Sequence, residues 1–249
     1  LMSGGQSARP EQNGQLHDAF VLHTRPFRNS SQIIDLLSLS MGRISLIARG
    51  SSRGKSPQSI LLQPFRPLLV SWRGRGEMPA LTQVEAAAPP YRLQGRRMFC
   101  GLYANELLVR LLHRGDAIPG LYQLYQQLVE QLSAGGDEGQ LLRSFEVQLL
   151  ESVGFGFDLH CDRDGTPIQS GQRYRYHPEQ GMVPLAAENS QQTTVTGETL
   201  EWLRTTEAEV EQTILREAKQ LLRAAIDYHI PGELQSRKLI AQYSTLNLH

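Results

Sequence analysis

The sequence has few cysteines and no long apolar run. Its 249 residues include two cysteines, Cys100 and Cys161. Two thiols cannot form a disulfide framework or fill a four-thiolate zinc site, and their scarcity is typical of proteins that fold in a reducing compartment. No stretch approaches the 18 apolar residues of a membrane-spanning helix, and residues 1–16 are polar, without the apolar core of a secretory signal. We therefore expect a flexible leader at 1–16 and a soluble, cytoplasmic protein without membrane contact.

The chain also lacks a net charge, because 25 basic residues balance 25 acidic ones. This balance conceals two halves of opposite sign. Residues 1–98 contain 13 Lys and Arg against 5 Asp and Glu, whereas residues 99–249 contain 12 against 20. Seven basic residues and no acidic one lie between Asp35 and Glu77. Such a segment cannot neutralise itself locally, which predicts a polyanionic partner for the first half.

Short apolar runs separated by turn residues fill the first half. The runs are residues 19–23, 33–39, 44–48, 68–72 and 78–86. The turn at Met41 and Gly42 joins the second run to the third as a hairpin, while Pro26 closes the first run. Pro64 and Pro67 confine the fourth run to the start or edge of a barrel. This pattern predicts a five-stranded OB-fold barrel over residues 17–90.

The apolar period changes to that of helices after residue 98. Apolar residues recur every three or four positions over 99–112, 121–132, 141–153 and 210–225. Residues 157–195 read as a loop-rich insertion with a hairpin that pairs 174–176 with 182–183 and turns through Gly181. We therefore predict an α+β chain, in which the barrel is followed at 91–249 by a mainly α-helical domain with a small β-hairpin insertion.

No motif of catalysis or cofactor binding is complete. Residues 50–56 resemble a phosphate-binding loop, but only three residues separate Gly50 from Gly54 where the motif has four, and Pro57 interrupts the helix that should follow. His160 and Cys161 form an adjacent pair without the C-x-x-C spacing of a zinc site. No nucleophile signature occurs either. We expect no catalytic residue, cofactor or bound metal.

The basic residues of the first half are candidate phosphate ligands, because they lie in or beside predicted turns and face no local carboxylate. They are Arg25, Arg43, Arg49, Arg53, Lys55, Arg73 and Arg75. A barrel can gather such residues on one side, and Phe27, Phe65 or Trp72 is available for base stacking, although each suits a core position equally well. Nucleic acid is the predicted ligand. A barrel that binds acidic protein tails, or RNA, is the alternative.

Several segments, in order along the chain, resemble the RecO family of bacterial DNA repair proteins. The resemblance rests mainly on residues 19–26, 46–50, 62–69, 74–77, 101–108, 142–146, 154–156 and 174–176. It implies an OB-fold and a helical domain in a recombination mediator without enzymatic turnover. It also implies binding to single- and double-stranded DNA, strand annealing, and action with RecR to load RecA onto DNA coated by single-stranded DNA-binding protein. A nucleoid-associated chain that is a monomer when alone is the corresponding expectation.

The same resemblance raises two points about the second domain. Many family members carry a four-cysteine zinc site there, whereas Cys161 stands alone, so hydrogen bonds or apolar packing should replace the metal in the loop after Phe157. Family members also bind the acidic C-terminal tail of single-stranded DNA-binding protein. We expect its groove around Arg143, because a guanidinium fork suits a terminal carboxylate; the apolar walls are Leu121, Tyr125 and Leu142. An arginine that merely pairs with a nearby glutamate is the alternative.

Overall fold

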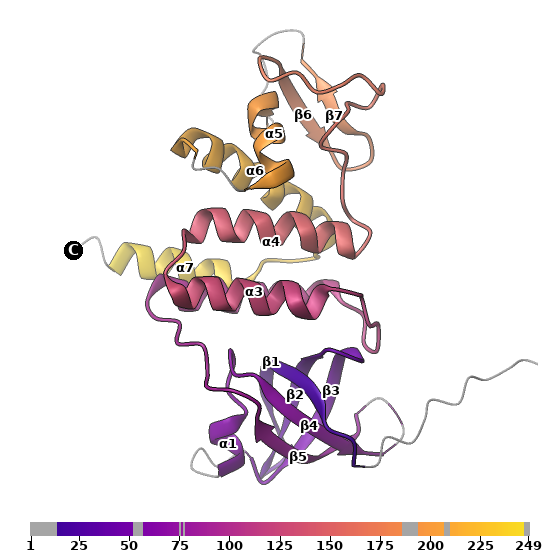
Figure 1. Cartoon of the computed structure of the whole chain (residues 1–249), viewed down its shortest axis with the longest axis vertical. Helices are drawn as coiled ribbons and strands as arrows, with labels where there is room; N and C mark the ends of the chain where they lie inside the picture. Colours follow the sequence, from indigo (N-terminus) through magenta and orange to yellow (C-terminus); the bar gives the residue numbers. More distant parts are fainter. Residues whose placement is uncertain are drawn as a thin grey trace, which may run out of the picture. The chain divides into compact units, whose positions relative to one another are not determined.

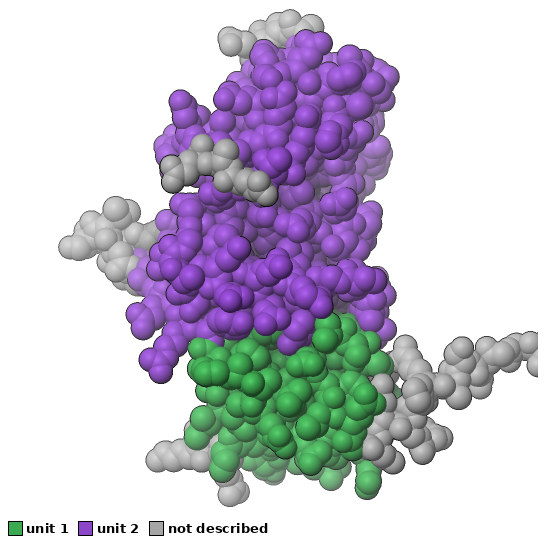
Figure 2. All heavy atoms as spheres, viewed as in Figure 1, with its two compact units in different colours: residues 1–90 green, residues 91–249 purple. Residues whose placement is uncertain are grey.

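The structure is a computed structural model that describes residues 14–51, 57–74, 76, 78–185, 194–206 and 210–246. The chain divides into two compact units, residues 1–90 and residues 91–249 (Figure 2). The boundary therefore falls between Pro90 and Tyr91. Each unit is described by itself below.

Five strands of the first unit close into a barrel. They are β1 (His17–Phe27), β2 (Ser31–Ser38), β3 (Gly42–Arg49), β4 (Leu68–Arg73) and β5 (Ala80–Ala86), and the short helix α1 (Pro57–Leu61) precedes β4 (Figure 1). The strand order is β1-β2-β3-β5-β4, closed by pairing of β1 with β4. All pairs are antiparallel except β3 with β5. The predicted OB-like barrel is confirmed.

Alternating residues of the strands fill the barrel. The interior cluster consists of Ala19, Val21, Ile34, Leu36, Leu46, Ala48, Leu62, Leu68, Val70, Trp72 and Leu81. Burial of this apolar surface is the main force that closes a small barrel, at about 25 cal/mol per Å² removed from water. Trp72 belongs to this cluster and Phe65 is buried as well. Two of the three aromatic residues considered for base stacking are therefore core residues.

The hairpins follow the turn chemistry of the sequence, with one exception at Pro26. Ser38 pairs with Gly42 across a three-residue loop, and Gly42 takes the positive φ of 62° that ends such loops. Pro26 does not end β1, because the strand continues to Phe27. In this part of β1 only β2 is a neighbour, since β4 pairs with residues 17–19 alone. The strand thus has an unpaired edge there, and such an edge tolerates a proline that lacks an N–H donor.

The second unit contains six helices and a small sheet within the described residues. The helices are α2 (Arg96–Leu111), α3 (Leu121–Ala134), α4 (Glu138–Ser152), α5 (Gly197–Thr205), α6 (Gln212–His229) and α7 (Gln235–Leu246). The strands β6 (Arg173–His177), β7 (Gly181–Pro184) and β8 (Thr194–Thr196) pair in the order β7-β6-β8. The four predicted helices and the hairpin are present; α5, α7 and the third strand β8 were not anticipated.

Helix α4 lies at the centre of the second unit. It packs against α3 on one side and against α5 and α6 on the other (Figure 1). Asp137 caps its start by accepting a hydrogen bond from the Gln140 N–H at 2.8 Å, and Phe145 is almost completely buried along its length. None of the helices in the described part of the chain is long and apolar enough to cross a membrane.

Candidate nucleic-acid interface

Strand register brings arginines from distant parts of the sequence into one row. Arg25 of β1 pairs with Ile33 of β2, which pairs with Ile47 of β3. Ile47 pairs in turn with Ala80 of β5, and Ala80 pairs with Arg73 of β4. Directly paired residues share a face, and the neighbours of this row along β2 to β5 line the core. The row therefore faces outward and passes around the closed barrel, with an exposed arginine at each end.

A second row lies two residues further along β1. Phe27 pairs with Ser31, and Ser31 pairs with Arg49 at the end of β3. Arg28 follows in the β1–β2 turn, and its guanidinium carbon lies 5.1 Å from the centroid of the Phe27 ring. Arg28 has a positive φ of 55°, a left-handed conformation that is unfavourable for a residue with a side chain. Both rows cross the outside of β1, β2 and β3, and the first continues over β5 to β4.

These rows define an exposed cationic surface, which we call the basic face. It consists of Arg25, Arg28 and Arg49, all of them exposed. Arg73 is exposed as well, but it lies around the closed barrel from these three, because β4 meets β1 only at residues 17–19. In the described part of the chain, none of the four makes an ion pair with a carboxylate. Arg28 was not among the residues that we selected from the sequence. Its position beside Phe27, between the first two predicted strands, was the available signal.

Arg43 differs from these residues and from its expected environment. Its Nη2 atom lies 3.4 Å from Oδ1 of Asp35, and only 14% of its side chain is exposed. The same Asp35 oxygen accepts a hydrogen bond from the Ser45 hydroxyl at 2.5 Å. The expectation that Arg43 faces no carboxylate is therefore wrong, because the β2–β3 register carries Asp35 alongside it. The side chain lies six residues from Arg49 along β3, or roughly 20 Å at the rise of a strand.

Three of the predicted phosphate ligands lie outside the described residues. They are Arg53, Lys55 and Arg75. Their assignment stays a prediction from the sequence.

The residues expected to bind an acidic tail are buried in the second unit. Leu121, Leu142 and Tyr125 have little or no exposed surface, and the Tyr125 hydroxyl donates to Oδ1 of Asn105 at 2.7 Å. Arg143 is 6% exposed and forms an ion pair with Glu146. Its Nε lies 2.6 Å from Oε2 of Glu146, and its Nη2 lies 2.8 Å from Oε1. Helices α3 and α4, which carry these residues, pack against each other. The Arg143 guanidinium is therefore not exposed as expected. The tail site stays a prediction, and it requires that the tail carboxylate displace Glu146.

A polar network joins this ion pair to the C-terminal helix. The Tyr103 hydroxyl of α2 donates to Oε1 of Glu146 at 2.7 Å, and burial next to Glu146 raises the pKa of Tyr103. Arg237 of α7 lies over the Tyr103 ring, with its guanidinium carbon 5.6 Å from the centroid, and pairs with Asp227 of α6. One buried carboxylate thus sits where α2 and α4 meet, with α7 beside it.

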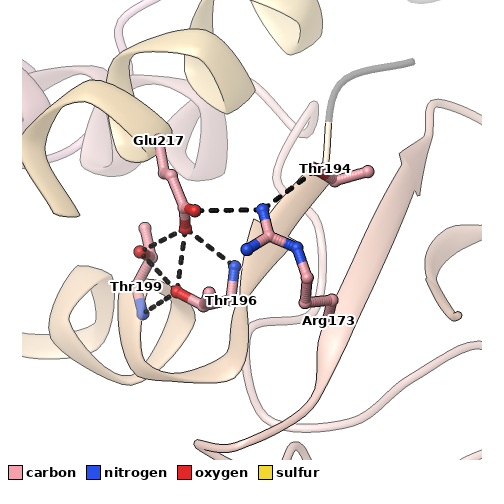
Figure 3. Close-up of polar contacts among 5 residues, drawn as sticks. All are labelled: Arg173, Thr194, Thr196, Thr199 and Glu217. Carbon is pink, nitrogen blue, oxygen red and sulfur yellow. Dashed lines mark hydrogen bonds and ion pairs between the residues drawn. The ribbon is translucent and has the colours of Figure 1, made fainter. Parts of the chain in front are cut away.

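A second carboxylate, Glu217 of α6, anchors the small sheet. Its Oε2 accepts from the Thr196 N–H and hydroxyl, both at 2.8 Å, and from the Thr199 hydroxyl at 2.9 Å (Figure 3). Its Oε1 lies 3.2 Å from Arg173 of β6. Burial opposes ionisation of Glu217, but the threonine hydrogen bonds and the Arg173 charge outweigh it and hold its pKa below the usual range. Glu217 therefore ties α6 to β6, β8 and the start of α5.

Hydrogen bonds organise the loop after Phe157. Asp158 Oδ1 accepts from the N–H groups of His160 and Cys161 at 2.7 and 3.2 Å. Asp162 Oδ1 accepts from the N–H groups of residues 164 and 166, both at 2.9 Å. Such aspartate turns order a loop through its own backbone donors. Within the described residues, no three His, Cys, Asp or Glu side chains gather as a metal site would require.

The described residues form an OB-like barrel with exposed arginines that have no carboxylate partner there, followed by a helical unit with a small sheet. Two family models divide the chain in the same way: "Recombination protein O N terminal" matches residues 15–90, and "Recombination protein O C terminal" matches residues 92–238. The chain belongs to the RecO family.

Relatives that are named DNA repair protein RecO match nearly the whole chain. The protein of Methylococcus capsulatus is 42% identical over 231 residues, which is 92% of this chain and 94% of the relative. That of Nitrosococcus oceani is 39% identical over 233 residues, covering 93% and 94% of the two chains. That of Halorhodospira halophila is 41% identical over 225 residues, covering 89% and 94%.

Proposed function

We propose that this chain is a DNA-binding recombination mediator of DNA repair. It binds single- and double-stranded DNA through its barrel, anneals complementary strands, and acts with RecR to load RecA onto DNA coated by single-stranded DNA-binding protein. The observation that supports DNA binding is the basic face, because exposed arginines without carboxylate partners suit phosphate contacts. The annealing and loading steps rest on membership of the RecO family.

The proposed annealing mechanism is electrostatic. Two DNA strands repel one another through their phosphates, and a protein surface with several unpaired guanidinium groups lowers that repulsion while it raises the local concentration of both strands. Base pairing then supplies the free energy of annealing. The reaction should proceed without ATP, and the interrupted spacing between Gly50 and Gly54 supports this expectation. ATP-dependent annealing, or one zinc ion per chain by elemental analysis, would contradict the proposal.

A titration of labelled single-stranded DNA at several salt concentrations tests DNA binding directly. Affinity should fall linearly on a log-log plot, with a slope of roughly 0.7 for each phosphate contact. The double variant Arg53→Glu, Lys55→Glu should bind all sequences more weakly and with a smaller slope. Binding that is independent of salt would exclude phosphate contacts as the basis of the interaction.

Two other functions give different results in the same assay. An adaptor for acidic protein tails would bind an acidic peptide at the barrel and bind DNA no better. An RNA-binding barrel would bind an RNA strand more tightly than DNA of the same sequence. The DNA proposal requires that DNA binds at least as tightly as RNA, and that an acidic peptide competes only weakly for the basic face.

We also propose that the second unit binds the acidic tail of single-stranded DNA-binding protein at Arg143. Because Glu146 occupies this guanidinium, the carboxylate of the tail has to replace that of Glu146. Glu146→Gln should therefore strengthen binding of a tail peptide, whereas Arg143→Lys, which keeps the charge but loses the fork, should weaken it. Binding of the peptide by fluorescence anisotropy checks both variants. Unchanged affinity in both would place the tail site elsewhere.

A further inference from the structure

The basic face contains one aromatic side chain. The first unit has four Phe and Trp residues and no Tyr, and three of them, Phe20, Phe65 and Trp72, are buried. Phe27 is only partly buried, at the last position of β1. Its strand neighbours place it on the outer surface in the same row as Arg49 and one pleat away from Arg25. An apolar ring is thus held among cations rather than in the core.

Phosphate contacts alone do not explain a ring at this position, because a phenyl group offers nothing to a phosphate. It does offer a flat face on which an unpaired base can stack, and this interaction tolerates any base sequence. In a duplex, the faces of each base are already covered by the neighbouring base pairs. A ring on the protein surface therefore distinguishes single strands from duplexes, whereas the arginines around it attract both.

The neighbouring Arg28 is suited to hold the backbone of such a strand. Its guanidinium carbon lies 5.1 Å from the Phe27 centroid, which is within the range of a cation–π contact. The contact orients the ring while no nucleic acid is bound. Because Arg28 makes no ion pair in the described part of the chain, its charge is available to a phosphate next to a base stacked on Phe27.

We propose that Phe27 is a base-stacking residue that makes the basic face prefer single-stranded nucleic acid over duplex, with Arg28 as its phosphate-binding neighbour. This inference rests on the proposed DNA-binding function and adds the residue that sets its strand selectivity. It predicts a separation of roles. Phe27 contributes affinity that depends on bases and not on salt, and Arg28 contributes affinity that depends on salt and not on bases.

The test compares a labelled oligothymidylate, an abasic strand of the same length and a duplex, each titrated against the whole protein. Phe27→Ala should lower affinity for oligothymidylate at least about fivefold, the lower end of the effect of removing one stacking ring. Its affinity for the abasic strand and the duplex should not change, and neither should the salt slope. Arg28→Ala should reduce the slope by roughly 0.7 on oligothymidylate and on the abasic strand alike.

Three further variants separate stacking from folding. Phe27→Leu keeps apolar bulk without a flat face and should lose affinity like Phe27→Ala, whereas Phe27→Tyr should bind within about twofold of wild type. Leu39→Ala removes another exposed apolar side chain of the same barrel and should have no effect. Oligothymidylate affinity of Phe27→Ala equal to wild type, or an equal loss on the abasic strand, overturns the inference. Failure of the wild type to bind oligothymidylate at all instead overturns the proposed DNA-binding function.

Discussion

The two units of this protein use arginine in opposite ways. On the barrel, four arginines are exposed and have no carboxylate partner among the described residues: Arg73 and the three of the basic face. In the helical unit, three arginines each pair with a carboxylate. Arg143 pairs with Glu146 within α4, Arg173 of β6 pairs with Glu217 of α6, and Arg237 of α7 pairs with Asp227 of α6. The difference follows from composition, since the first 98 residues have 13 basic and 5 acidic residues while the remainder has 12 and 20. Where carboxylates are scarce, arginines stay available for a ligand; where they are plentiful, arginines stabilise the fold.

The strongest test of this comparison is the buried pair in α4. Arg143→Ala leaves the Glu146 carboxylate buried, with the Tyr103 hydroxyl as its one remaining partner among the described residues. Removal of one member of a buried ion pair costs about 3–5 kcal/mol. Arg49→Ala on the barrel should change stability by less than about 0.5 kcal/mol, as is usual for an exposed side chain. Urea denaturation of both variants measures the difference, and equal losses would show that the two arginines do not differ in role.

The next largest effect concerns Glu217 and its dependence on pH. Glu217→Gln removes a charge that accepts three hydrogen bonds from threonines, and hydrogen bonds to charged groups contribute roughly 1.5–3 kcal/mol. Because the folded pKa lies below the ordinary value of 4.5, the ionised carboxylate stabilises the fold above that pH. This stabilisation is lost as the pH falls through the folded pKa.

Thermal unfolding of wild type and Glu217→Gln from pH 7 to pH 3 checks this sign. The variant should be less stable at pH 7, and the two curves should converge in acid. A stability difference that stays constant over the whole range would contradict the assignment of a low pKa to Glu217.

The third test reverses charge on the basic face. Arg25→Glu combined with Arg49→Glu should lower affinity for single-stranded DNA more than tenfold, because two phosphate contacts are lost and two repulsions are added. The log-log salt slope should fall by roughly 1.4, or 0.7 for each lost contact. The matched control is Arg163→Glu combined with Arg223→Glu, which reverses two exposed arginines of the second unit. Equal losses from control and test would show that the overall charge, and not the face, determines binding.

Local chemistry was sufficient to predict most elements of the fold. The Gly42 hairpin is set by residues next to it in the sequence, and it was predicted. The helices α5 and α7 depend instead on distant partners. Glu217 binds the Thr196 cap of α5, and Glu106 of α2 accepts from the N–H groups of Gln235 and Ser236 at the start of α7. A carboxylate 129 or 130 positions away leaves no signal in a local window.

The candidate site shows the same limit. Its composition was predictable, because the excess of arginine over carboxylate is visible in the sequence. The pairing of Arg43 with Asp35 was not, since it depends on a strand register that joins residues eight positions apart. The grouping of Arg25 with Arg49 depends on the pairing of β1 with β2 and of β2 with β3. Counting charges thus finds the strand segments that form the face but not which arginines remain unpaired on it.

The smallest expected effect tests this last point within a single strand. Arg43 and Arg49 lie at opposite ends of β3 and differ mainly in their surroundings: Arg43 is held by Asp35 and largely covered, whereas Arg49 is exposed beside Ser31 and Phe27. Arg49→Ala should therefore reduce the salt slope of single-stranded DNA binding by roughly 0.7, while Arg43→Ala leaves it unchanged. The identical substitution in one strand removes differences in chemistry and in net charge. A loss of slope in Arg43→Ala equal to that in Arg49→Ala would mean that DNA displaces Asp35, and that an existing ion pair does not exclude an arginine from the interface.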